Sequence, residues 1–191
     1  MRISEVLGLS WSDVDFEKKR INVWRQISYR VRRGYFFQTP KTESSKRYIV
    51  ADEHLLSELI RWRARQVENE KEFGDSYVCI YREDDGHIIS QSKGLPAPAA
   101  EKVSLICTYT DGRRVLKNRF SRVLQKEGLN AHSFRHTHTT QLVENGAPIK
   151  AVAGRLGHSN TQITQNLYTR NTEKLQETAA AIFTQILQTN A

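Results

Sequence analysis

The stretch that decides the fold runs from His132 to Tyr168 and reads HSFRHTHTTQLVENGAPIKAVAGRLGHSNTQITQNLY. Its apolar residues recur with helical spacing. Gly146 and Gly157 interrupt the pattern where the C-terminal caps of helices belong. Here and in the remaining C-terminal residues we therefore expect four helices, over residues 133–145, 148–156, 161–169 and 172–188.

Upstream of this region the pattern becomes strand-like. Runs of β-branched and aromatic residues predict a three-stranded antiparallel meander over residues 20–29, 35–39 and 46–51. Further helices are expected over residues 2–10, 52–69 and 115–127. Residues 76–81 predict another strand, and residues 82–112 an exposed excursion that could carry a hairpin. This order predicts an α+β fold, a mainly helical domain with a three-stranded antiparallel sheet on one side.

The length and composition narrow the class of protein. A chain of 191 residues is long enough for one domain with its own apolar core. No apolar run approaches the roughly 18–20 residues that cross a bilayer, and no leader-like segment opens the sequence. Cys79 and Cys107 sit in apolar, strand-like surroundings, so we expect two buried, reduced thiols. The sequence therefore predicts a cytoplasmic protein with no membrane partner.

The net charge of +8 is concentrated in two stretches. Residues 30–47 hold six basic side chains against one acid, and residues 113–126 hold six against none. Two basic patches on a near-neutral body favour a polyanionic partner, nucleic acid first, although solvated surface faces would give the same counts. The candidate DNA-binding residues are Arg30, Arg32, Arg33, Lys46, Arg47, Arg113, Arg114, Lys117, Arg119 and Arg122.

The quoted stretch also gathers side chains suited to phosphate chemistry. Arg135 offers a planar fork of donors that matches two phosphate oxygens. His132, one helical turn earlier, titrates near neutrality and can transfer protons. His158 follows a helix end, and Tyr168 lies ten residues further on. A tyrosine hydroxyl among cationic groups can attack a phosphodiester, although each residue taken alone also has an ordinary structural or surface role.

Zinc binding is the alternative for the histidines of this stretch. His132 and His136 are four residues apart and His138 follows, a spacing that could hold zinc. However, the HExxH glutamate is absent, no cysteine is near, and Arg135 would repel a cation. We therefore expect neither a metal nor a cofactor.

These residues resemble the C-terminal signature of the tyrosine recombinases, the phage-integrase family. The segment MRISEVLGL at residues 1–9 looks like the first arginine box of that family, and Trp11 to Asp15 continues it. The segment TPKT at residues 39–42, with SKR at 45–47 behind it, looks like the hairpin that carries the catalytic lysine. The ordered pattern Arg, Lys, His-x-x-Arg, Gly-His, Tyr is highly specific, and with gaps the match spans most of residues 1–170.

The resemblance implies a role for each matched residue at the scissile phosphate. Arg2 and Arg135 would bind its non-bridging oxygens, and Glu5 would be a supporting acid that orients neighbouring residues.

The remaining matched residues would move protons and make the covalent bond. Lys41 would protonate the 5′-oxygen leaving group, and His132 would assist proton transfer. His158 would hydrogen-bond the phosphate and help to place Tyr168. Tyr168 would attack to form a 3′-phosphotyrosyl link, which a 5′-hydroxyl from another strand resolves without metal or ATP.

The resemblance thus implies a site-specific DNA recombinase or integrase of a mobile element, bacterial or phage-encoded, acting as a tetramer on double-stranded DNA. Residues 1–170 would be the catalytic domain, without the family's N-terminal helices and DNA-clamp domain. Residues 171–191 would form a helix that packs on its own domain or, as we favour, is exchanged between subunits. The alternatives are a type IB topoisomerase-like strand transferase and a non-enzymatic or truncated DNA-binding module.

Overall fold

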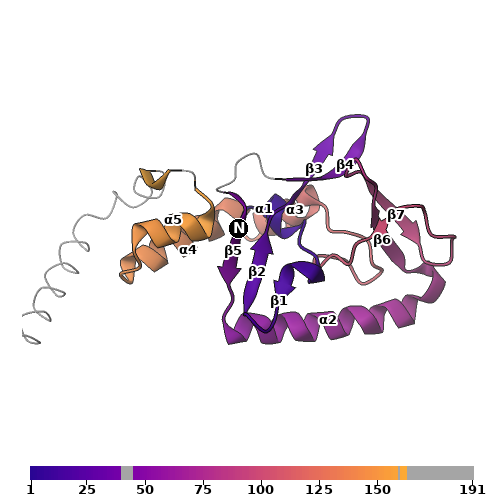
Figure 1. Ribbon diagram of the computed structural model, residues 1–191, viewed down its shortest axis with the longest axis horizontal. Coiled ribbons are helices and arrows are strands. Elements are labelled where there is room, and N and C mark those ends of the chain that lie inside the picture. The colour runs from indigo at the N-terminus through magenta and orange to yellow at the C-terminus, as the bar shows by residue number, and fades with distance from the viewer. Residues whose placement is uncertain (40–44, 159, 163–191) are drawn as a thin grey trace, which may run out of the picture. The chain divides into compact units, whose positions relative to one another are not determined.

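The computed structural model describes residues 1–39, 45–158 and 160–162 (Figure 1). Its contacts divide the chain into two compact units, Met1–Ala131 and a second unit that begins at His132. The expected α+β fold is confirmed, because helices and antiparallel sheets both form in this chain. Among the described residues, no helix is long and apolar enough to cross a membrane.

The first sheet of unit 1 is three-stranded and antiparallel, in the order β1 (Val14–Asp15), β2 (Arg20–Val23) and β5 (Arg47–Val50). One face of the sheet contributes buried apolar residues, Val14, Ile21 and Ile49 among them. The long helix α2 (Glu53–Phe73) packs Leu56 into the same core. This helix begins at Asp52, whose carboxylate accepts a hydrogen bond from the backbone N–H of Leu55 at 2.8 Å.

The predicted meander is wrong in its strand composition. Residues 20–29 form two strands rather than one, and β3 (Gln26–Arg30) pairs only with β4 (Gly34–Gln38) in a separate hairpin. The break falls at Trp24 and Arg25, where Arg25 turns inward into a buried polar network. The strand that completes the first sheet is therefore β1, not the one expected over residues 35–39.

The excursion over residues 82–112 contains the hairpin that the sequence allowed, but it is not simply exposed. β6 (Val78–Arg82) pairs with β7 (Ile88–Ser92) and, on its other edge, with β8 (Glu101–Lys102). The chain that follows buries Val103, Leu105 and Ile106 in the two apolar cores of unit 1. A polar-looking segment therefore closes the core between α2 and the sheets.

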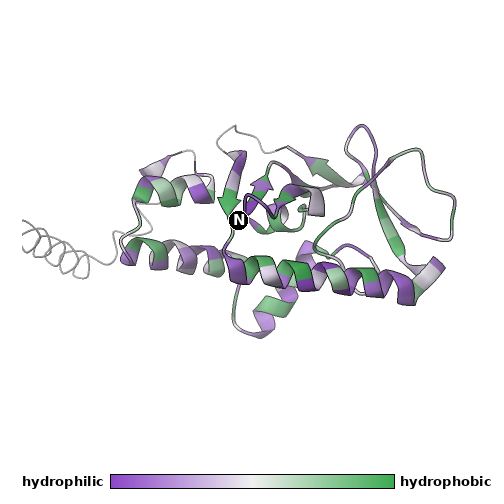
Figure 2. Cartoon of the chain, turned by 60° about the horizontal axis from the view of Figure 1, so that its bottom comes forward, coloured by the Kyte–Doolittle hydropathy of each residue, from purple (hydrophilic) through white to green (hydrophobic). Residues whose placement is uncertain are grey.

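Two helices of unit 1 differ in length from the prediction. The helix expected over residues 2–10 is only the single turn α1 (Ile3–Val6), after which the chain enters the short 3-10 helix η1 (Trp11–Asp13). The chain after α1 packs closely on β3, since a Cβ at Gly8 would lie 3.2 Å from the backbone of Gln26. By contrast, α2 continues four residues beyond the expected end, to the 3-10 turn η3 (Gly74–Ser76). Figure 2 shows apolar and polar segments alternating along α2, as expected for a helix with one buried face.

The described part of unit 2 contains a helical hairpin. The helices α4 (Ala131–Glu144) and α5 (Ile149–Leu156) form within two residues of the expected bounds. They pack through Val143, Val152 and Leu156. Gly157 caps α5 in the left-handed conformation at φ 69°, as the sequence predicts. The helices expected over 161–169 and 172–188 lie almost entirely outside the described residues.

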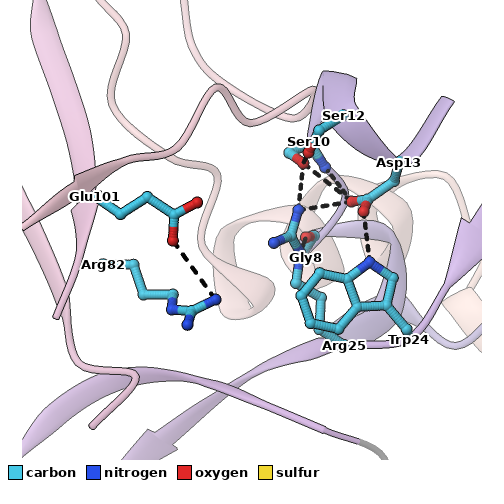
Figure 3. Close-up of polar contacts among 8 residues, drawn as sticks. All are labelled: Gly8, Ser10, Ser12, Asp13, Trp24, Arg25, Arg82 and Glu101. Atoms are coloured by element: carbon cyan, nitrogen blue, oxygen red, sulfur yellow. Dashed lines mark hydrogen bonds and ion pairs between the residues drawn. The ribbon is translucent and has the colours of Figure 1, made fainter. Parts of the chain in front are cut away.

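A buried polar network joins η1 to the bend between β2 and β3 (Figure 3). The Asp13 carboxylate accepts hydrogen bonds from Arg25 Nη2 at 2.7 Å, Trp24 Nε1 at 2.6 Å and the Ser10 backbone N–H at 2.8 Å. Arg25 also donates to the Gly8 carbonyl at 3.0 Å and to the Ser10 hydroxyl. Both side chains of the ion pair are almost fully buried, at 6% and 3% exposed. The network therefore fixes the chain between the first helix and the first sheet.

Replacing Asp13 by alanine should destabilise unit 1 by about 3–5 kcal/mol, because Arg25 is left as a buried charge without its carboxylate. Urea unfolding followed by tryptophan fluorescence measures this change, since Trp11, Trp24 and Trp62 all lie in unit 1. Asp15→Ala is the matched control, since its partner Lys18 is 70% exposed. The control should cost no more than about 1 kcal/mol. Equal losses for the two variants would contradict the assignment of the network.

Candidate active site

The first cluster of predicted catalytic residues lies in unit 1, where Arg2 opens α1. The backbone N–H of Arg2 donates to Glu5 Oε2 at 2.7 Å, and its guanidinium Nη1 donates to Glu5 Oε1 at 3.0 Å. This is the local geometry of a helix start, in which a glutamate three residues on satisfies an unpaired N–H. Glu5, for which the resemblance implies a supporting role, therefore contacts Arg2 directly.

Arg47, the first residue of β5, binds the same carboxylate from the other side. Its Nη1 lies 3.3 Å from Glu5 Oε1, and its Nη2 lies 3.0 Å from Oε2. The side chains of Glu5 and Arg47 are 2% and 7% exposed, whereas that of Arg2 is 42% exposed. Arg47, predicted from the sequence to contact DNA, is thus a buried partner of Glu5. We name these three residues the Arg2 cluster.

The electrostatics of the Arg2 cluster keep Glu5 ionised. Burial by itself would raise the pKa of Glu5, but the hydrogen bonds from Arg47 and Arg2 outweigh it and hold this pKa below its ordinary value. A carboxylate buried with two guanidinium partners is therefore a fixed negative charge. It holds the exposed Arg2 guanidinium in place.

The second cluster lies in unit 2, where the first turns of α4 meet the C-terminal end of α5. Arg135 Nη2 donates to the carbonyl oxygen of Leu156 at 2.7 Å, which anchors the arginine to the last turn of α5. Thr139, fully buried, donates its hydroxyl to the Arg135 carbonyl at 2.7 Å. The bond to Leu156 ties the Arg135 guanidinium to the end of α5, and the bond from Thr139 lies on the backbone of α4.

His158 follows this anchor by two residues. Gly157 takes the left-handed conformation, and the backbone N–H of His158 then donates to the Ala153 carbonyl at 3.0 Å. A helix end of this kind sets the direction in which the next residue leaves. The predicted catalytic residues Arg135 and His158 are thus both fixed by the C-terminus of α5.

The histidines of α4 are largely exposed to solvent, and His138 is partly desolvated. The rings of His132 and His136 lie 6.4 Å apart. Arg155 Nε donates to His138 Nε2 at 3.3 Å, and burial together with the Arg155 charge lowers the pKa of His138. Within the part of the chain that the structure describes, no three His, Cys, Asp or Glu side chains gather as a metal-binding group.

The first group of predicted DNA-binding residues surrounds the turn of the β3–β4 hairpin. The Arg30 guanidinium lies 4.3 Å from the ring centre of Phe36, and Arg33 pairs with Asp85 at 3.6 Å. Arg32 has a positive φ of 62° at the tip and is exposed. Lys46 is exposed next to β5. The tip of the hairpin therefore presents basic side chains to solvent.

The second group precedes and lines α3 (Lys117–Lys126), a helix that buries none of its residues. Its basic residues Lys117, Arg119 and Arg122 are all exposed. Arg113 pairs with Asp111 at 2.5 Å. Arg114 stacks 3.4 Å from the ring centre of Tyr35, and burial lowers the pKa of this arginine. The basic face expected of this helix is therefore present.

Two of the predicted catalytic residues, Lys41 and Tyr168, lie outside the described residues. Two contacts in these clusters were not predicted. The sequence predicts Arg47 as a DNA contact because it belongs to a basic run, and its pairing with Glu5 has no signal in the sequence. Thr139 could have been found, because a threonine four residues after Arg135 on a helix can reach its carbonyl.

An α+β fold, with an arginine at the start of its first helix and an arginine and a histidine on a later helical hairpin, agrees with the sequence pattern of an integrase-type domain. The chain belongs to the phage integrase family, whose family model matches residues 1–174. The sequence resemblance to the tyrosine recombinases is thereby confirmed.

Similar proteins that are described as recombinases or integrases support this family membership. A tyrosine recombinase XerC-like protein of Caldanaerobacter subterraneus subsp. tengcongensis is 33% identical over 180 residues, covering 88% of this chain and 42% of that protein. The integrase of Staphylococcus phage L54a is 31% identical over 180 residues, covering 92% of this chain and 46% of that protein. The chain thus spans less than half of the length of either relative.

Solved structures share the fold. The integrase of transposon Tn1549, in complex with a circular intermediate DNA, matches with a TM-score of 0.66 and 23% identity, covering 97% of this chain and 54% of that one. The XerA recombinase matches with a TM-score of 0.57 and 19% identity, covering 94% of this chain and 52% of that one.

Replacing Glu5 by glutamine should destabilise unit 1 in a pH-dependent manner. A carboxylate with a depressed pKa in the folded state stabilises the fold above its ordinary pKa of 4.5 and loses this contribution as the pH falls through the folded value. The difference in unfolding free energy between wild type and Glu5→Gln should therefore be largest near neutrality and shrink below about pH 4.5. Urea unfolding at several pH values measures it. A gap that stays constant down to acid pH would rule out this role of the ionised carboxylate.

Replacing Gly157 by alanine should destabilise the α4–α5 hairpin by about 1–2 kcal/mol, because alanine is strained in the left-handed conformation. Hydrogen exchange of the Val152 and Leu156 amides measures the local stability. Gly154→Ala is the matched control, since its Cβ would meet open space within α5. The control should stabilise the helix by about 0.5–1 kcal/mol. Protection that does not fall in Gly157→Ala would refute the cap.

Proposed function

We propose that this chain is the catalytic part of a site-specific DNA recombinase of a mobile element, which cuts and rejoins DNA strands through a 3′-phosphotyrosyl intermediate. The observation that carries the proposal is the Arg2 cluster, in which a buried carboxylate orients a partly exposed guanidinium. Its place in the sequence, ahead of His-x-x-Arg, Gly-His and Tyr, supports the same reaction. The product of each cut is an ester, so the energy of the broken bond is retained for rejoining.

The arginines bind the phosphate. Arg2 and Arg135 bind non-bridging oxygens of the scissile phosphate, because a guanidinium provides paired donors and a charge that does not titrate. Neutralising the charge that develops on these oxygens is the main electrostatic requirement of phosphoryl transfer. The hydrogen bond from Arg135 to Leu156 limits the side-chain entropy lost on binding.

The remaining groups transfer protons and form the bond. His158 hydrogen-bonds the phosphate and His132 assists proton transfer, since an imidazole can both donate and accept a proton. Tyr168 is the nucleophile, and Lys41 donates a proton to the leaving 5′-oxygen. A free 5′-hydroxyl then attacks the phosphotyrosyl ester, which reverses the first step on a new strand.

The partner is double-stranded DNA at a recombination site in the bacterial cytoplasm. The exposed basic residues of α3 and the tip of the β3–β4 hairpin supply contacts to the phosphate backbone. The Tn1549 integrase, whose fold this chain shares, has been solved in complex with circular intermediate DNA, and this supports the choice of partner. The enzyme acts as a tetramer in which residues 171–191 are exchanged between subunits.

Covalent trapping tests the proposed reaction. The chain is incubated with a pool of duplexes of random sequence, each nicked so that the short cleaved fragment diffuses away and rejoining is prevented. We expect a denaturation-resistant protein–DNA adduct that disappears in Tyr168→Phe. Arg2→Ala and Arg135→Ala should each slow its formation by at least about a hundredfold, the loss typical of removing a charge-stabilising donor.

Tyr48→Phe is the matched control, because Tyr48 is exposed on β5 and has no predicted role. It should form the adduct at the wild-type rate. Binding of the duplexes without any adduct would refute the enzyme and favour a DNA-binding module. Relaxation of supercoiled plasmid without any target site would favour the topoisomerase-like alternative.

A further inference from the structure

The Glu5 carboxylate receives one hydrogen bond on each oxygen from each of two arginines. Oε1 accepts from Arg2 Nη1 and Arg47 Nη1, and Oε2 accepts from the Arg2 backbone N–H and Arg47 Nη2. A carboxylate has about four acceptor sites, so these four bonds saturate it. Its orientation is therefore set jointly by α1 and β5.

The two arginines differ in what else they can do. Arg47 is 7% exposed and also donates to the Ser45 carbonyl at 2.9 Å, so its guanidinium is committed to the protein interior. Arg2 is 42% exposed and can meet a ligand. The buried arginine supports the carboxylate, and the carboxylate supports the exposed arginine.

The structural elements that carry Arg2 and Arg47 also differ in rigidity. α1 has only four residues, too few to be stable by itself, and Arg2 stands at its first turn. Arg47 lies on β5, directly opposite the fully buried Val23 of β2 in the first sheet. The bond between Glu5 and Arg47 spans 42 residues of sequence and ties the short helix to that sheet.

We propose that Arg47 is a positioning residue, which aligns the Glu5 carboxylate so that this carboxylate holds Arg2 ready for the scissile phosphate. This role takes the place of the DNA contact predicted for Arg47, and it rests on the proposed function. Arg47 itself touches neither substrate nor reacting atoms. Among the residues that the structure describes, the charged groups bonded to Glu5 are Arg2, at the start of its own helix, and Arg47 from β5.

Replacing Arg47 by lysine tests the proposal with the charge retained. A lysine has no planar fork and cannot serve both carboxylate oxygens. Glu5 then takes up a proton at higher pH, and Arg2 loses a charged acceptor. The pH below which adduct formation falls should rise by about one unit, a tenfold change in the protonation equilibrium. Arg47→Met should shift it further.

Arg25→Lys is the matched control, because Arg25 forms an equally buried ion pair, with Asp13, that does not involve Arg2. It should lower the stability of unit 1 without moving the pH profile. In the double variant Arg2→Lys/Arg47→Lys, the second change should alter the adduct rate by less than about twofold, because both act through one contact. The proposal would be overturned if the pH midpoint of adduct formation were the same in Arg47→Lys and wild type. It would also be overturned if the rate loss of the double variant equalled the product of the two single losses.

An NMR titration of the Glu5 side-chain carbon separates this proposal from the proposed function. It needs no DNA, and the Glu5 midpoint should rise in Arg47→Lys and stay unchanged in Arg25→Lys. If wild type forms no adduct, the proposed function fails, while the titration still decides whether Arg47 controls Glu5. A Glu5 midpoint that is equal in wild type and Arg47→Lys overturns the positioning role in either case.

Discussion

A carboxylate removed from water must be paired, and this constraint on Glu5 organises the first part of the chain. Two guanidinium groups satisfy it, and together they outweigh the tendency of burial to protonate the acid. Because one partner lies on the first helical turn and the other on β5, the same contact closes the fold and orients a side chain toward solvent. The same hydrogen bonds therefore stabilise the fold and orient the Arg2 side chain.

The helices α4 and α5 could be predicted closely, because glycines at left-handed positions mark their ends in the sequence itself. The sheets were predicted less well, and Arg25 shows why. Ile21, Val23, Arg25 and Ile27 alternate as buried residues, so the charge lies on the inward face, where only its distant partner Asp13 makes it tolerable. Strand propensity is local, whereas this bend is dictated by a pairing across the fold. The same holds for the segment around Leu105, which was predicted to belong to an exposed excursion and is buried against strands far away in sequence.

For the candidate site, the residue types and their order could be recognised from the sequence. The different environments of the arginines could not. Arg2, Arg47 and Arg135 carry the same charge, yet the structure gives them three environments: partly exposed on a carboxylate, buried on that carboxylate, and anchored to a helix-end carbonyl. Such differences depend on burial and on acceptors far away in sequence. A count of basic residues contains no information on burial or on these acceptors.

The burial of Arg25 and Arg47 also changes how the charge of this protein should be counted. Each is neutralised within the fold by a carboxylate that is equally hidden. When a protein binds a polyanion, the counterions released reflect only the cations that reach its phosphates. These two arginines therefore count among the 29 basic residues without adding to the salt sensitivity of such binding, to which exposed cations such as those of the hairpin tip and α3 contribute.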